Sequence, residues 1–174
     1  MPILIGLHYD MVKIIPYCSE WKKCFEEEKT GLLSILGDNV IDIQHIGSTS
    51  VPGLVAKPII DMMVGFRNFY DSFKYIEKLE EQGYKFLGIA DIRGRLFLVK
   101  GNEEITTHHL HIVEYGSELW LEQLAFKEYL CKNAKVAKEY AQLKQKLAEK
   151  FEFDRDSYTS AKADFVRNII NKSL

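Results

Sequence analysis

The spacing of hydrophobic positions predicts helices at both ends of the chain. Apolar residues recur every three or four positions, as on one face of a helix, over residues 20–36, 71–83, 117–131, 134–150 and 156–170. Ser19 precedes the first segment as a candidate N-cap, and Gly83 ends the second. The lysines of residues 132–150, Lys144 among them, are expected mostly on a solvated helix face.

Shorter apolar segments lie between the first and the third predicted helix. Their composition and the turn residues around them predict strands at residues 40–46, 58–64, 84–89, 95–100 and 107–113. Together these elements predict an α+β fold: a mixed sheet of about five strands with flanking helices and a helical C-terminal part over about residues 117–174. The length of 174 residues, 47% of them hydrophobic, fits a single domain over residues 1–174.

Composition and charge indicate the cellular compartment of the protein and the kinds of binding partner to expect. The formal net charge of −2 argues against an extended basic surface for nucleic acid. Cys18, Cys24 and Cys131 are widely spaced and form no Cys-x-x-Cys pair, as expected of reduced thiols. No apolar run has the length needed to cross a bilayer. We therefore expect a cytoplasmic protein without a membrane partner, whose oligomeric state the sequence leaves open.

Candidate chemistry concentrates in residues 45–64. Gly47 and Ser48 open a small, hydroxyl-rich turn, where backbone N–H groups and a serine hydroxyl can meet a phosphate. Asp61 follows inside the apolar run 58–64, where a charge is costly unless a metal, a cation or hydrogen bonds compensate it. Strand alternation places Asp61 and Met63 on one face and Met62 on the other. This segment predicts a phosphate-binding turn that faces a carboxylate.

The segment 45–64 resembles the signature of the GrpB family, a branch of the nucleotidyltransferase superfamily. The likeness extends over nearly the whole chain, through residues 14–17, Trp21, 94–101, 108–114, Trp120, 124–126, 129–130, Tyr140, 143–144, 158–162 and 165–166. It implies a nucleotidyltransferase-like fold and a nucleotide or phosphorylated small molecule as the ligand. Some actinobacterial relatives are fused to dephospho-coenzyme A kinase, which the resemblance offers as a hint of nucleotide or coenzyme A context.

The superfamily pattern implies two acids on the strand after the turn, and this chain departs from it. Asp61 matches the first acid, whereas Met63 stands at the position of the second. The pair of carboxylates that clamps metal ions between nucleotide phosphates is therefore incomplete. Apolar residues at this position are typical of the GrpB branch, so the departure puts nucleotidyl transfer itself in doubt.

Histidines on the strand 107–113 are candidates to replace the missing acid. His109 and His111 share a strand face, and with Asp61 they would make a three-ligand metal site with open positions. The resemblance favours Mg²⁺ or Mn²⁺, and the histidines would also suit Zn²⁺. In the alternative interpretation, one histidine is a hydrogen-bonded core residue and the other lines a cleft without metal.

Charged and small residues near the turn complete the candidate site. Gly47, Ser48 and Thr49 are the candidate phosphate-binding residues, with Lys57, Arg95 and Lys100 as counter-charges. The alternative for this turn is a tight connection whose serines cap a short helix. His45 is either a cleft residue that serves as acid, base or ligand, or a strand-end histidine bonded within the sheet.

Three function hypotheses follow from these residues. The first is a nucleotidyltransferase-like protein that binds a nucleotide or phosphorylated metabolite, with metal-dependent nucleotidyl transfer in which Asp61, His45 and His111 are the catalytic candidates. The second is a domain that binds such a ligand without catalysis, which Met63 supports. The third is metal-dependent hydrolysis at a cluster of His45, Asp61, His109 and His111.

Overall fold

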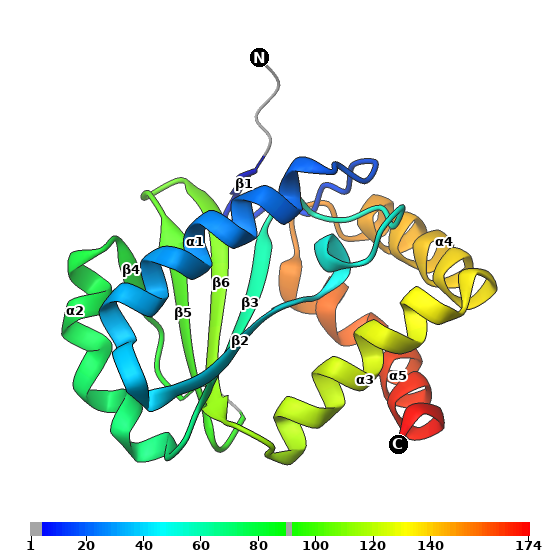
Figure 1. Cartoon of the computed structure of the whole chain (residues 1–174). Helices are drawn as coiled ribbons and strands as arrows, with labels where there is room; N and C mark the ends of the chain where they lie inside the picture. The colour runs from blue at the N-terminus through cyan, green and yellow to red at the C-terminus, as the bar shows by residue number, and fades with distance from the viewer. Residues whose placement is uncertain (1–4, 90–91) are drawn as a thin grey trace.

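The computed structural model describes residues 5–89 and 92–174 and has a six-stranded mixed sheet flanked by helices (Figure 1). The path order is β2-β3-β6-β5-β4, and β1 pairs with β6. The strands are β1 (Leu7–His8), β2 (Val40–Ile46), β3 (Ile60–Phe66), β4 (Tyr84–Phe86), β5 (Arg95–Gly101) and β6 (Ile105–Glu114). The helices are α1 (Glu20–Leu36), α2 (Ile76–Glu81), α3 (Glu118–Lys132), α4 (Ala134–Lys150) and α5 (Arg155–Ser173), with short 3-10 turns η1 (Gly37–Asn39), η2 (Ser48–Ser50) and η3 (Phe69–Tyr75). The predicted α+β class is confirmed.

The central strand pair places the acid beside the histidines. Strands β3 and β6 run parallel, with Asp61 opposite His109 and Met63 opposite His111. The other pairings in the sheet, including β2 with β3 and β5 with β6, are antiparallel. A parallel pair needs a long crossover, which here consists of η3, α2, β4 and β5.

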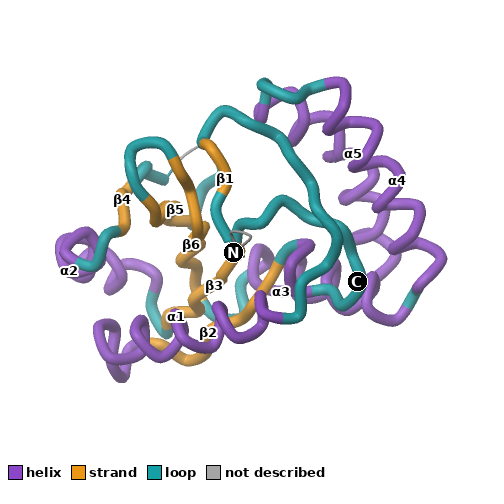
Figure 2. Tube along the Cα trace, turned by 90° about the horizontal axis from the view of Figure 1, so that it is seen from above, coloured by secondary structure: helices purple, strands orange, loops and turns teal. Residues whose placement is uncertain are grey.

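One face of the sheet carries the main hydrophobic core. Buried side chains of α1 pack there against alternate residues of the strands, among them Ile60, Met62 and Val64 of β3. Because successive strand side chains alternate, Asp61 and Met63 point to the opposite face. Figure 2 shows α1 and α2 along one side of the sheet. The predicted alternation along residues 59–64 is therefore confirmed.

The C-terminal helices lie beside the sheet and have a core of their own. Trp120 of α3 packs against Met63 in a small buried cluster on the sheet face opposite α1. Farther out, side chains of α3, α4 and α5 enclose Val51 and Leu54 from the segment after η2. Figures 1 and 2 show α4 and α5 as a helical layer at the β2–β3 side of the molecule. This layer brings its inner surface toward the turn that follows β2.

Several predicted boundaries need correction. Residues 71–83 contain most of η3 followed by the short helix α2, so one regular helix was wrong there. Strand β4 ends at Phe86, three residues earlier than predicted. Ser19 makes no side-chain cap bond to α1, whereas the unpredicted Asp154 caps α5 by accepting the Ser157 N–H. Within residues 5–89 and 92–174, no helix combines the length and the apolar character of a membrane span.

Candidate functional site

A cleft of about 1260 Å³ opens on the sheet face opposite α1, and most of the predicted site residues line it. The sheet contributes Asp61, His109, His111 and Arg95, and the turn after β2 contributes Gly47. Helices α4 and α5 contribute side chains from the other wall, which are Tyr140, Lys144, Arg155, Asp156, Tyr158, Thr159, Lys162 and Val166. The turn, the acid and the two histidines therefore share one cleft.

Gly47 brings the turn directly against Asp61. Its backbone has a φ of +69°, a conformation that residues other than glycine rarely adopt. A Cβ at this position would also lie 2.6 Å from Oδ2 of Asp61. Glycine is therefore required both by the backbone conformation and by the space that the carboxylate occupies.

Asp61 and His109 form a hydrogen-bonded pair across the parallel strands. The His109 Nδ1 and the Asp61 Oδ1 are 2.9 Å apart. Burial raises the pKa of Asp61, but the hydrogen bond from His109 and nearby positive charges, Lys57 among them, outweigh burial and lower it to about 2. The carboxylate is thus ionised at neutral pH and fixes the orientation of the imidazole, which lines the cleft.

His111 lies farther along β6, in an aromatic and cationic setting. Its ring stacks on Phe97 of β5 at a centroid distance of 5.0 Å, and its Nδ1 is 3.5 Å from a guanidinium nitrogen of Arg95. Burial lowers the pKa of His111 to about 3, with the charges of His109 and Arg95 acting in the same direction. His111 is therefore neutral at pH 7.

The donor set does not fit a metal site built by protein side chains. In the parts of the chain that the structure describes, no three side chains of His, Cys, Asp or Glu are grouped as metal ligands would be. Asp61 already accepts a hydrogen bond from His109. Met63 has no carboxylate to offer a metal, and its side chain is buried against Trp120. The expected set of Asp61, His109 and His111 therefore lies in one cleft without forming a three-ligand centre.

The turn after β2 presents hydrogen-bond donors to the cleft. Within η2, the N–H groups of Ser50 and Val51 bond to the carbonyls of Gly47 and Ser48, so the N–H groups of Ser48 and Thr49 have no acceptor inside the turn. The Ser48 side chain interacts with the Tyr140 hydroxyl of α4. This contact joins the turn to the helical wall.

Two lysines on the helical wall were not predicted, Lys144, which is buried, and Lys162, which is half-buried. Lys144 on α4 is 1% exposed, its ammonium donates to the Val55 carbonyl, and it lies 4.9 Å from the centre of the Tyr140 ring. Lys162 on α5 lies 4.1 Å from the centre of the Tyr158 ring. The expectation that Lys144 belongs to a solvated face was wrong. Burial, with a smaller contribution from neighbouring lysines, lowers the pKa of both lysines to about 7.

A repeated spacing in the sequence could have revealed these lysines. Tyr140 precedes Lys144 by four residues in α4, and Tyr158 precedes Lys162 by four residues in α5. Residues four apart share a helix face, so each lysine belongs to the face that its buried tyrosine occupies. Lys57, which was predicted, joins the same group with its ammonium 5.4 Å from the centre of the Tyr158 ring.

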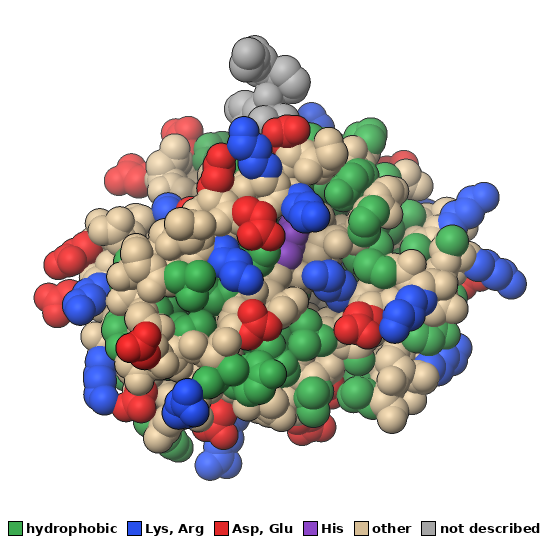
Figure 3. Space-filling model, viewed as in Figure 1, with side chains coloured by type: hydrophobic (Ala, Val, Ile, Leu, Met, Phe, Trp, Pro, Cys, Tyr) green, Lys and Arg blue, Asp and Glu red, His purple; other side chains and the backbone are tan. Residues whose placement is uncertain are grey.

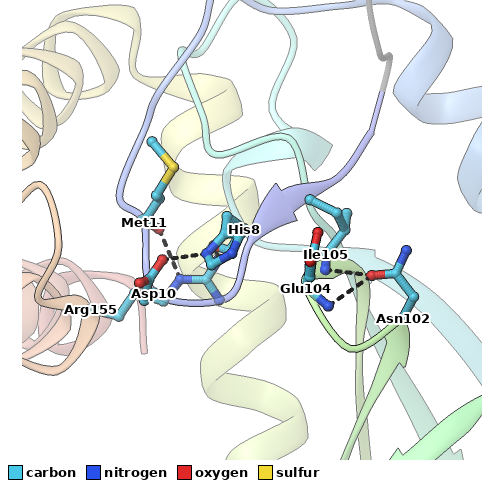
Figure 4. Close-up of polar contacts among 7 residues, drawn as sticks. All are labelled: His8, Asp10, Met11, Asn102, Glu104, Ile105 and Arg155. Atoms are coloured by element: carbon cyan, nitrogen blue, oxygen red, sulfur yellow. Dashed lines mark hydrogen bonds and ion pairs between the residues drawn. The ribbon is translucent and has the colours of Figure 1, made fainter.

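Arg155 connects the rim of the cleft to the N-terminal segment (Figure 4). Its guanidinium donates to the carbonyl of His8 at 2.8 Å and to that of Met11 at 2.9 Å. On the opposite side of this view, the Asn102 side chain accepts the N–H groups of Glu104 and Ile105 and fixes the turn between β5 and β6. Arg155 thus lines the cleft while two of its nitrogens donate to backbone carbonyls.

Three predicted residues have side chains that turn away from the cleft. His45 stacks on Phe25 of α1 and bonds to Thr49 Oγ1 at 2.9 Å, and burial lowers its pKa to about 4. The Thr49 hydroxyl is therefore committed to His45. Lys100 borders the cleft, but its ammonium pairs with Glu28 of α1 at 2.7 Å. Strand alternation turns both side chains toward α1, so His45 fits the alternative of a hydrogen-bonded histidine outside the cleft, and the Lys100 ammonium is paired with Glu28.

Comparison with known proteins places the chain in a family. The sequence profile of the family described as GrpB protein matches residues 11–172. The chain belongs to the GrpB family. It is 41% identical over 173 residues to the glutamate-rich protein GrpB of Alkalihalophilus pseudofirmus, which covers 97% of this chain and 99% of that protein. The resemblance that the sequence motifs carry is therefore confirmed.

Solved structures agree with this membership and extend the likeness in fold. The crystal structure of the conserved protein GrpB from Enterococcus faecalis matches with a TM-score of 0.87 and 36% identity, over 92% of this chain and 96% of that chain. The structure of Cid1 in complex with the UTP analogue UMPNPP matches with a TM-score of 0.54 and 15% identity, over 84% of this chain and 48% of that chain. The second match shows a shared nucleotidyltransferase fold alone.

Proposed function

We propose that the cleft of this GrpB-family chain binds a nucleotide or another phosphorylated small molecule. The observation that carries the proposal is the position of Lys144 and Lys162, the first buried and the second half-buried, which line the cleft together with Ser48 and its turn. Burying a charge costs free energy unless an opposite charge or hydrogen bonds compensate it, and a bound phosphate would compensate both lysines. The nucleotide bound in the structure of Cid1 supports this ligand class.

Binding fits the geometry better than metal-dependent transfer. Nucleotidyl transfer by the route of the superfamily needs carboxylates that hold Mg²⁺ or Mn²⁺ beside the phosphates, and here Met63 stands where the second one would be. Hydrolysis with a bound metal such as Zn²⁺ would need the cluster of His45, Asp61, His109 and His111, and His45 lies on the other face of the sheet. We therefore favour the second hypothesis, a binding domain, and derive no step through a metal.

Thermal denaturation with a panel of compounds tests the proposal. A ligand that binds the folded state alone raises the melting temperature, by an amount equivalent to about 2.7 kcal/mol at one hundred times its dissociation constant. We expect nucleoside diphosphates, nucleoside triphosphates or coenzyme A precursors to raise it, and the unphosphorylated nucleosides to leave it unchanged. Lys144→Met should abolish the shift, and Lys146→Met, at an exposed position of the same helix, should preserve it. A panel without any phosphate-dependent shift would contradict the proposal.

A further inference from the structure

Positive charge dominates the inner end of the cleft. Lys57, Lys144 and Lys162 approach one another closely enough that Lys57 lowers the pKa of both other lysines, in addition to the larger effect of burial. Arg155 in turn lowers the pKa of Lys57, again after burial. Asp61 acts on all three lysines in the opposite direction. Lys57 and Lys162 both lie over the Tyr158 ring, and Lys and Arg side chains outnumber Asp and Glu in the cleft lining, which leaves the group of lysines without charge balance.

A divalent cation is poorly suited to this surrounding. Magnesium and calcium are held by oxygen ligands, chiefly carboxylates, and no three-ligand group exists among residues 5–89 and 92–174. Asp61 already accepts a hydrogen bond from His109. A second positive ion beside three lysines would add like-charge repulsion in a partly buried place, whereas a polyphosphate would remove it.

We propose that the cleft binds the phosphate groups of its ligand free of divalent metal, with Lys57, Lys144 and Lys162 neutralising the charge that metal ions neutralise in metal-dependent nucleotide sites. This inference rests on the proposed function and specifies the form of the ligand: an anion with at least two phosphate groups. Three lysines from three separate segments, the loop before β3, α4 and α5, surround the place of those phosphates. The tyrosine rings of α4 and α5 hold two of the ammonium groups in position.

Calorimetric titration with inorganic pyrophosphate tests the inference. One titration contains EDTA, and the other contains Mg²⁺ in excess over pyrophosphate. We expect binding in EDTA and weaker apparent binding with Mg²⁺, because magnesium competes with the lysines for the same oxygens. Binding that appears with Mg²⁺ and is absent in EDTA would overturn the inference while leaving the proposed function intact. Absence of pyrophosphate and nucleotide binding under both conditions would overturn the proposed function itself, and the inference with it.

Variants locate the binding in the same experiment. Lys144→Met and Lys162→Met should each weaken pyrophosphate binding in EDTA by about tenfold to a hundredfold, as expected for loss of one charge-assisted hydrogen bond. Lys146→Met and Lys172→Met, at exposed positions of α4 and α5, are matched controls and should bind as the unchanged protein does. Melting curves establish that each variant is folded. Unchanged affinity in both folded variants, Lys144→Met and Lys162→Met, would overturn the inference.

Discussion

At the residue scale, Asp61 joins three segments through one carboxylate. Oδ1 accepts the hydrogen bond of His109 on β6, and Oδ2 lies 2.6 Å from the position that a Cβ of residue 47 would take. Asp61 also offsets part of the repulsion among Lys57, Lys144 and Lys162. Its pKa is lowered because the hydrogen bond and charge of His109, together with the charge of Lys57, outweigh burial and stabilise the charged form. We interpret Asp61 as the structural counter-charge of the cleft.

Asp61→Asn should therefore destabilise the protein and preserve its binding of pyrophosphate. The folded-state pKa of about 2 lies below the ordinary value of 3.8, so the stabilisation is complete above about pH 4 and disappears as the pH falls through about 2. The shift corresponds to roughly 2 kcal/mol at pH 7, which urea unfolding can measure. Asp164→Asn, at an exposed position of α5, is the control. An unchanged free energy of unfolding combined with lost ligand binding would indicate a metal-ligand role for Asp61 instead.

At the element scale, helices α4 and α5 each contribute a tyrosine and a lysine one turn apart. The pairs Tyr140–Lys144 and Tyr158–Lys162 place an ammonium over an aromatic ring on the face that each helix turns inward. Each lysine stem is covered, and each charge reaches the cleft. The two helices thus do more than cover the sheet, because they form the cationic wall opposite the turn after β2.

This wall should make the stability of the ligand-free protein depend on pH. Lys144 and Lys162 have folded-state pKa values of about 7, below the ordinary 10.5, so the unfolded chain binds more protons between these values. The free energy of unfolding should therefore rise with pH from about 7 toward 10. The charged groups that face the pair are Lys57 and Asp61. Lys144→Met and Lys162→Met should flatten the rise in melting temperature, and Lys146→Met should not. Equal slopes in all three variants would contradict the lowered pKa values.

The elements themselves could be predicted from the sequence because their periodicity is local. The bounds of α1 and β2 agree with the hydrophobic pattern, and the Gly47–Ser48 turn and Asp61 are found by motif. The burial of Lys144 could not be deduced from the charge pattern of α4, because neighbouring lysines on that helix are exposed. His45 was a candidate for the cleft because histidine is often a catalytic residue. Strand alternation decides which sheet face its side chain takes, and it places His45 on the face that α1 covers.

At the scale of the whole molecule, charge is concentrated inside the cleft and balanced outside it. The formal net charge is −2, and on the face in Figure 3 the Lys and Arg side chains are interspersed with Asp and Glu. An extended polyanion such as nucleic acid favours a continuous basic surface, whereas a small anion needs a few cations in a recess. The cleft between the sheet and helices α4 and α5 is such a recess. The arrangement therefore favours a small phosphorylated ligand.

A crystal structure of the protein with pyrophosphate, grown in EDTA, tests this account most directly. The account predicts phosphate groups in the cleft, with oxygens within hydrogen-bond distance, about 2.7–3.2 Å, of the ammonium groups of Lys144 and Lys162 and beside the Ser48 turn. Pyrophosphate seated elsewhere on the molecule would contradict it. So would a cleft without pyrophosphate at a concentration that saturates binding in solution.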